Sequence, residues 1–246
     1  MTMSAVGKLA AAWAQAWLQR FRARHDLLAQ AAAPLDASRW LRDGQRLLLH
    51  VGCGQATLTH IASPGLQQPG WREIRLDADA EVFPDIVGTM TDMCRVPDAA
   101  VDAVFSSHGI EHLYWHDVPR ALREFQRVLA DDGFLLVTCP DLQAAARMIA
   151  EDRMFDTAYV SAAGPITPFD IVYSYRPFVE ANPEWMAHHC GFTLSTLTAA
   201  LNAAGFAAVL GRQRDAAFDL WVLASKSPRS TAQMQALTAD YFPAGD

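Results

Sequence analysis

Apolar runs alternate with helical patterns along residues 46–225, which predicts an α/β fold. The apolar runs are four to eight residues long and bounded by turn residues, as in strands buried on both faces of a parallel sheet. Between them, the repeat of apolar positions predicts helices over 117–129, about 142–151 and 193–204. The expected strands are 47–51, 71–76, 85–90, 101–105, 134–138, 206–211 and 218–225. Only RQRDAA separates the last two, so they must form an antiparallel hairpin.

Three segments do not follow this alternation. Residues 4–33 have apolar side chains close to the helical period, and Pro34 ends the pattern. We therefore expect an N-terminal amphipathic helix over 1–35, packed on the catalytic domain or capping its cleft, with a membrane-surface or dimer helix as the less favoured alternative. Residues 36–225 would form the main domain, in which the proline- and aromatic-rich stretch 154–191 reads as an ordered insertion that covers a pocket. Residues 226–246 are predicted to be a polar tail.

Composition narrows the class of protein. The chain has 246 residues, of which 51% are apolar and 19% charged, and its formal net charge is −7. A nucleic-acid backbone is therefore not expected as the main partner. No apolar run is long enough to span a bilayer, so no membrane partner is expected. The four cysteines are scattered without a CxxC pair, which indicates reduced thiols in a cytoplasmic protein.

The stretch LLLHVGCGQATL, residues 47–58, organises the prediction of function. A strand, a glycine turn and the start of a helix suggest a loop whose backbone N–H groups approach a bound cofactor. A dinucleotide site requires G-x-G-x-x-G, and Thr57 stands where its third glycine belongs. Asp77 ends the second strand, where a carboxylate can accept both ribose hydroxyl protons, and Asp92 follows the third. An NAD-linked oxidoreductase remains a weaker alternative.

At this point the chain resembles the class I S-adenosylmethionine-dependent methyltransferases, especially their small type 11-like members. The resemblance covers roughly residues 46–225. It implies a Rossmann-like sheet of seven strands in the order 3-2-1-4-5-7-6, with strand 7 antiparallel and helices on both faces. It rests on HVGCGQATL, RLDAD, GTMTDM, VFSSHGIEHL, LREFQRVLADDGFLLVTCPD and the terminal AGF hairpin.

The resemblance also implies which residues bind S-adenosylmethionine. The methionine carboxylate would lie at the N-terminus of the helix after the glycine turn. Two positions depart from the family pattern: His50 replaces the usual acid, and Ala56 replaces the last glycine, which is tolerable if its φ is negative. The residues that would contact the cofactor are Gly52, Cys53, Gly54, Gln55, Asp77, Ala78, Thr91, Asp92, Met93 and Ser107.

Residues that could carry chemistry follow the strand ends. His108 is the candidate general base, with a cofactor or loop contact as the alternative. Glu111-His112 is expected to tie its loop to the next helix, and Asp141 is a further candidate to face the substrate. His188-His189-Cys190 could suggest a metal, but adjacent residues seldom supply converging ligands, so no metal is expected. The aromatic residues of the insertion either wall a substrate pocket or form the insertion's own core: Phe169, Tyr173, Tyr175, Phe178 and Trp185.

These observations lead to one main functional hypothesis. We expect a methyltransferase that uses S-adenosylmethionine on an unidentified, small-molecule acceptor, with homo-oligomerisation through the N-terminal helix as a possibility. The departures at His50 and Ala56 motivate an alternative, a catalytically silent cofactor-binding or interaction protein with the same fold.

Overall fold

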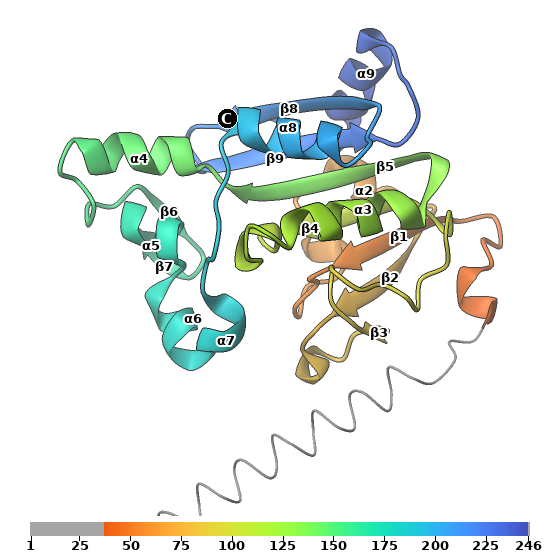
Figure 1. The fold of residues 1–246 in the computed structure, drawn as a ribbon, viewed down its shortest axis with the longest axis horizontal. Helices are drawn as coiled ribbons and strands as arrows, with labels where there is room; N and C mark the ends of the chain where they lie inside the picture. The colour runs from red at the N-terminus through yellow and green to blue at the C-terminus, as the bar shows by residue number, and fades with distance from the viewer. Residues whose placement is uncertain (1–36, 246) are drawn as a thin grey trace, which may run out of the picture. The chain divides into compact units, whose positions relative to one another are not determined.

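The computed structural model describes residues 37–245, and those from Trp40 onward form one compact unit (Figure 1). The helix predicted over 1–35 lies outside the described residues. A short 3-10 helix, η1 (Ala37–Trp40), is the first described element. Within 37–245, no helix combines the length and apolar character needed to cross a membrane.

The predicted sheet topology is confirmed. Seven strands within the described residues form one sheet in the order β3-β2-β1-β4-β5-β9-β8, and β9 is antiparallel to both of its neighbours. The parallel strands β1–β5 end at one edge, as Figure 1 shows. The bounds are β1 Arg46–Val51, β2 Trp71–Asp77, β3 Ile86–Val87, β4 Val101–Ser107, β5 Leu129–Pro140, β8 Ala208–Arg214 and β9 Asp219–Ser225.

Helices bury both faces of this sheet (Figure 1). On one face lie α3 (Val118–Val128) and α8 (Leu194–Ala203), and on the other α2 (Pro64–Gln67) and α9 (Thr231–Tyr241). The central strand β1 is accordingly apolar at successive positions, because Leu47, Leu48 and Leu49 are all fully buried. Covering both faces leaves the carboxyl ends of the strands as the open edge for a site.

The helix expected after the glycine turn, which Ser63-Pro64-Gly65 predicts to be short, is replaced by two short turns. The glycine turn is followed by a 3-10 turn, η2 (Leu58–His60), and then by the four-residue helix α2. The hydroxyl of Ser63 donates to the Tyr241 carbonyl at 2.6 Å, and Pro64 then begins α2. Because the chain is pinned against α9 and must begin β2 at Trp71, no long helix fits between them. The predicted helix N-terminus for a methionine carboxylate is therefore absent from the described residues.

The segment predicted as a polar tail contains α9, which is part of the core. Met234, Tyr241 and Phe242 are buried. The Tyr241 ring lies 4.6 Å from the Phe134 ring and 6.4 Å from the Trp71 ring. The sequence does not indicate this packing, because only two residues of α9 are buried and most of the others are polar.

The insertion is ordered and lies beyond the carboxyl ends of β4 and β5 (Figure 1). It follows α4 (Leu142–Ala150) and begins with a hairpin of β6 (Tyr159–Ser161) and β7 (Gly164–Ile166). The buried Asp170 accepts from the Thr167 hydroxyl at 2.6 Å and pairs with Arg176 at 2.9 Å. These bonds fix the course of the short helices α5 (Pro168–Tyr173), α6 (Arg176–Ala181) and α7 (Pro183–Met186).

The packing of α9 gives a stability test. Tyr241→Ala should lower the free energy of unfolding by about 3 kcal/mol or more, as expected for an aromatic side chain removed from a core. Phe83→Ala removes the side chain of a residue that is 86% exposed. This change should alter the free energy of unfolding by less than about 0.5 kcal/mol. Urea denaturation followed by circular dichroism measures both, and equal small effects would show that α9 does not belong to the core.

Candidate active site

The glycine loop after β1 has the backbone that only glycine adopts readily. Gly52 has φ +66° and Gly54 has φ +51°, both in the left-handed region. Ala56 is outside that region, so an alanine fits there without strain. The departure from the family pattern at position 56 is therefore accommodated.

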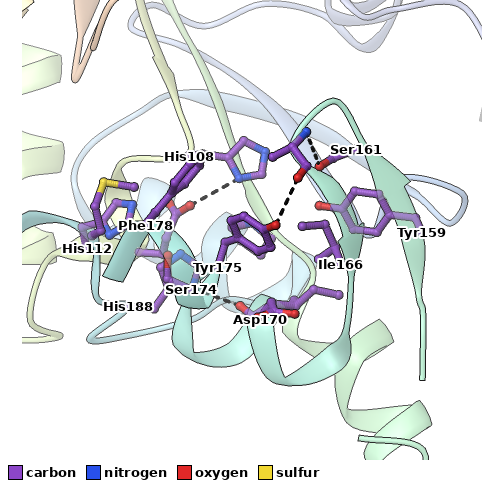
Figure 2. Close-up of a pocket in the computed structure, with 15 residues that line it drawn as sticks. His108, His112, Tyr159, Ser161, Ile166, Asp170, Ser174, Tyr175, Phe178 and His188 are labelled. Atoms are coloured by element: carbon purple, nitrogen blue, oxygen red, sulfur yellow. Dashed lines mark hydrogen bonds and ion pairs between the residues drawn. The ribbon is translucent and has the colours of Figure 1, made fainter. Parts of the chain in front are cut away.

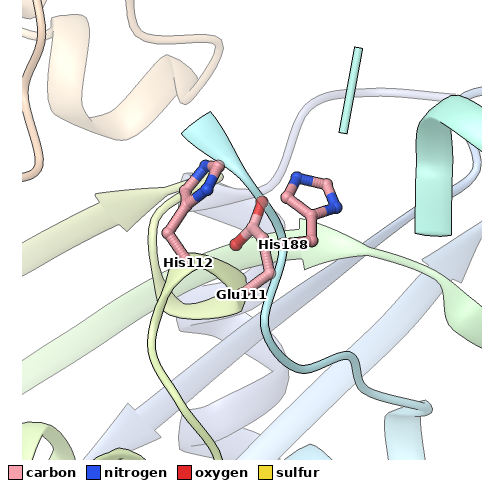
Figure 3. Close-up of side chains that lie close together, drawn as sticks. All are labelled: Glu111, His112 and His188. Carbon is pink, nitrogen blue, oxygen red and sulfur yellow. The ribbon is translucent and has the colours of Figure 1, made fainter. Parts of the chain in front are cut away.

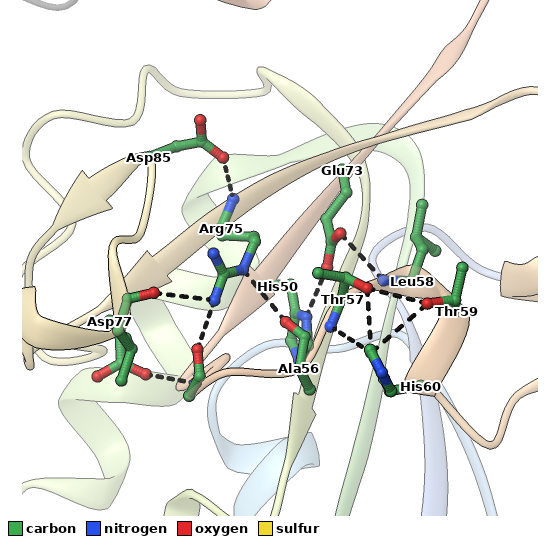
Figure 4. A network of polar contacts seen from close by, with 12 residues as sticks. His50, Ala56, Thr57, Leu58, Thr59, His60, Glu73, Arg75, Asp77 and Asp85 are labelled. Carbon is green, nitrogen blue, oxygen red and sulfur yellow. Dashed lines mark hydrogen bonds and ion pairs between the residues drawn. The ribbon is translucent and has the colours of Figure 1, made fainter.

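Alternate residues of β2 hold this loop in place (Figure 4). The Asp77 carboxylate accepts from the Gly54 N–H at 2.7 Å through one oxygen and from the Asp79 N–H at 2.9 Å through the other. The Arg75 guanidinium donates to the carbonyls of Gly54 and Ala56. The Asp77 carboxylate thus holds the loop at the Gly54 N–H, and the Arg75 cation holds it at two carbonyls.

His50 is compensated by an acid on the adjacent strand. Its Nδ1–H donates to Glu73 Oε1 at 2.7 Å, and the second carboxylate oxygen accepts from the Leu58 N–H at 3.0 Å (Figure 4). His50 is buried and Glu73 mostly buried, so this pairing occurs away from bulk water. A carboxylate therefore does reach the loop, from β2 instead of β1.

The loop opens on a cavity of about 670 Å³, here called the larger cavity. Its volume lies within the range of small-molecule sites. Its walls come from the glycine loop, the end of β2, the segment after β3, the segment after β4, and the insertion. Five of the predicted cofactor residues line it: Gly52, Gly54, Asp77, Ala78 and Thr91.

The other five predicted cofactor residues do not line this cavity. Cys53 and Met93 are buried, and burial together with the nearby Asp77 raises the pKa of the Cys53 thiol to about 12. Gln55 and Asp92 are exposed, and an Asp92 oxygen accepts from the Cys94 N–H at 3.3 Å. The hydroxyl of Ser107 is bonded to that of Thr138 at 2.8 Å.

Several lining residues were not predicted. Met90 and Gly109 come from strand ends, and Tyr114 and His189 come from later segments. The ring of Tyr114 stacks on that of His189 at 4.2 Å, which joins the segment after β4 to the insertion. Only the position of Met90 and Gly109 just after strands was a usable sequence signal, because the insertion has no periodicity.

A smaller cavity, of about 240 Å³, lies between the strand ends and the insertion (Figure 2). Tyr159, Ser161 and Tyr175 contribute polar groups to its wall, and Phe178 an apolar one. Both cavities are lined by His108, His112 and Met186. A molecule in one cavity would therefore meet a molecule in the other at these side chains.

His108 occupies the junction in a strained backbone conformation. Its φ is +49°, and its side chain is 48% exposed. Its Nδ1 lies 3.4 Å from an oxygen of the buried Glu111 (Figure 2). Desolvation acts to lower the pKa of His108, but the Glu111 carboxylate outweighs it and raises that pKa above its usual value.

The remaining predictions divide between the site and the scaffold. Tyr175 and Phe178 line the smaller cavity and Trp185 the larger one, whereas the Phe169 ring packs on those of Phe155 and Tyr173. Asp141 is buried, caps α4 through the Gln143 N–H at 2.9 Å, and accepts from Gln213 at 2.7 Å. Asp141 therefore lines neither cavity.

Comparison with known protein families identifies the part of the chain that builds the larger cavity. Residues 49–137 match the model of a family described as a methyltransferase domain. The chain contains a methyltransferase domain. The match includes the glycine loop, Asp77 and His108 and supports the predicted methyltransferase family, and the strand order confirms the predicted fold. The family also agrees with S-adenosylmethionine as the cofactor.

Solved structures with a similar fold are distant relatives. A Burkholderia thailandensis 1,6-didemethyltoxoflavin-N1-methyltransferase, with 1,6-didemethyltoxoflavin and S-adenosylhomocysteine bound, has 15% identity, 92% coverage of both chains and a TM-score of 0.47. An S-adenosylmethionine-dependent methyltransferase from Mesorhizobium loti has 18% identity, covers 81% of this chain and 99% of its own, and has a TM-score of 0.47. One from Archaeoglobus fulgidus has 14% identity, coverage of 75% and 87%, and a TM-score of 0.48. No protein of curated function matches the sequence.

The pairing of His50 with Glu73 can be tested by removing the carboxylate. Glu73→Ala removes both oxygens and leaves the His50 Nδ1 and the Leu58 N–H without this partner. The free energy of unfolding should fall by about 1–3 kcal/mol. Glu81→Ala, at an exposed position, is the matched control and should have little effect. If urea denaturation gives the same stability for both variants, Glu73 does not support the loop.

Proposed function

We propose that the protein transfers a methyl group from S-adenosylmethionine to a small-molecule acceptor. One observation carries this proposal: a cavity built on the glycine loop and Asp77 meets a second, smaller cavity at His108 and His112. Two abutting cavities suit a reaction between two bound molecules, because transfer requires the reacting atoms to be held close and in line.

The residues of the larger cavity fit the cofactor. Each Asp77 oxygen already accepts one backbone N–H, from Gly54 or from Asp79, and keeps a lone pair, so both can accept from ribose hydroxyls. Gly52 leaves room for a ligand beside the backbone, since a Cβ there would meet only the end of the Met90 side chain, at 3.7 Å. The lack of a long helix after the loop disfavours a dinucleotide, whose pyrophosphate would need that helix N-terminus. The smaller cavity, with its mixed polar and aromatic wall, is assigned to the acceptor.

When bound, S-adenosylmethionine supplies an electrophilic methyl carbon on a sulfonium. The chain's own residues position the acceptor so that one of its lone pairs forms the new bond to carbon as the carbon–sulfur bond breaks, with sulfur keeping that electron pair. His108, at the junction, accepts the proton that an oxygen or nitrogen acceptor loses. The insertion excludes water from the acceptor by closing the smaller cavity with Tyr159, Tyr175 and Phe178.

Cofactor binding is tested directly by calorimetry with S-adenosylhomocysteine. Asp77→Ala should lower the affinity by about 10- to 100-fold, the value of one or two hydrogen bonds to a charged group. His108→Asn, which tolerates the positive φ, should lower it by less than about 3-fold. Asp77→Asn serves as a second variant, since it keeps the side-chain volume near the loop. No binding by the wild-type protein, or equal losses in the Asp77 and His108 variants, would contradict these assignments.

Catalysis is tested with a pool of candidate acceptors, by mass-spectrometric detection of S-adenosylhomocysteine and methylated products. The wild-type protein should turn over at least one acceptor. His108→Asn should then reduce kcat by about 10²- to 10⁴-fold at unchanged cofactor affinity. Binding without turnover of any acceptor would favour the silent cofactor-binding protein, and full activity of His108→Asn would exclude His108 as the base.

A further inference from the structure

The acceptor side of the junction contains a cluster that methyl transfer alone does not require. Glu111 and His112 lie on the 3-10 turn η4 (Ile110–His112), and His188 lies on the insertion (Figure 3). One potential ligand atom from each of these three side chains lies within 4.8 Å of those of the other two. The N–H groups of His189 and Cys190 both donate to the Glu111 carbonyl, at 2.9 and 3.2 Å, and so bring the insertion to η4.

Apart from His108, the Glu111 carboxylate has no side-chain partner among the described residues. Its residue is 1% exposed, and neither carboxylate oxygen has a hydrogen bond. The only ion-pair contact given for it is His108 Nδ1, at 3.4 Å. Burying an ionised carboxylate in this way is unfavourable unless a cation compensates it.

Both histidines are oriented as metal ligands are. His112 Nδ1–H donates to the Ala187 carbonyl at 3.1 Å, and His188 Nδ1–H donates to the Ile171 carbonyl at 3.0 Å. Because a carbonyl can only accept, these bonds assign the proton to Nδ1 and leave Nε2 with a free lone pair. A backbone acceptor on the remote ring nitrogen is the usual second shell of a metal-bound histidine.

We propose that Glu111, His112 and His188 bind a divalent first-row transition ion such as Zn²⁺ at the junction of the two cavities. Two nitrogen ligands and one oxygen ligand suit such an ion better than Mg²⁺ or Ca²⁺, which prefer oxygen alone. Ligand atoms around Zn²⁺ are about 3.3 Å apart, given bonds of about 2.0–2.1 Å, so small side-chain rotations would close the cluster.

The ion would leave a position open to the smaller cavity, which all three ligands line. Three protein ligands are typical of a metal that also binds a substrate or water. On the function proposed above, the open position takes an oxygen or nitrogen donor of the acceptor and holds it beside the larger cavity, which His112 also lines. The acceptor class is therefore a small molecule with a metal-binding oxygen or nitrogen near the methylated atom.

The test is metal binding by the full chain after removal of adventitious ions with a chelator. Calorimetry with Zn²⁺ and visible absorption with Co²⁺ should each show one equivalent per chain. Glu111→Gln and His188→Gln should each weaken binding by more than about 100-fold, since even loss of a second-shell partner costs 10- to 100-fold. Azide should shift the Co²⁺ absorption bands by occupying the open position.

Two matched controls separate this site from other metal-binding side chains. His116→Gln alters an exposed histidine on the same segment, and Cys190→Ser removes the thiol next to the cluster. Both should keep the wild-type affinity. Circular dichroism must show that His188→Gln is folded. If Glu111→Gln does not fold, metal binding by His188→Gln and His112→Gln tests the proposal in its place.

The proposal is overturned if the wild-type protein binds neither ion, if both ligand variants keep full affinity, or if azide leaves the Co²⁺ spectrum unchanged. These outcomes are independent of S-adenosylhomocysteine binding. Cofactor binding without metal binding would reject only the metal site, and metal binding without cofactor binding would reject only methyl transfer.

Discussion

The site depends on the side-chain alternation of one strand. Successive side chains of a β-strand point to opposite sides, so Glu73, Arg75 and Asp77 of β2 share one side. All three bond to the glycine loop or to its flanks: Glu73 to His50 and Leu58, Arg75 to loop carbonyls, and Asp77 to the Gly54 N–H. The pairing of β1 with β2 brings these three side chains beside the glycine loop, which follows β1.

This arrangement changes the meaning of the two departures from the family pattern. A histidine in place of an acid on β1 would remove a negative charge from the loop, yet Glu73 restores a carboxylate there. Ala56 needs no glycine conformation. The sequence features that suggested an inactive protein are therefore compatible with an intact cofactor site. On the proposed function Asp77 would have two roles, because the carboxylate that would bind the ribose also holds the loop.

The insertion links the cofactor side of the molecule to the acceptor side. Backbone N–H groups of the insertion donate to the Glu111 carbonyl, and its His189 ring stacks on Tyr114. Its aromatic side chains line the smaller cavity. The buried Glu111 lies where these segments meet. A bound ion there would tie the insertion to the sheet edge and would couple acceptor binding to the geometry of the larger cavity.

The amino-acid sequence alone determined the α/β class and the strand order implied by the family, and it singled out the glycine loop, Asp77 and His108, which line the cavities. These features are local: buried strands are continuous apolar runs, and a glycine turn shows in a few adjacent residues. The sequence indicated that the helix after the loop is short but not the packing of α9, because that packing depends on contacts between residues far apart, such as Ser63 with Tyr241. For the same reason, only the tertiary structure placed Glu73 on His50 and His188 beside Glu111 and His112. Spacing along the chain cannot show which side chains from different segments converge.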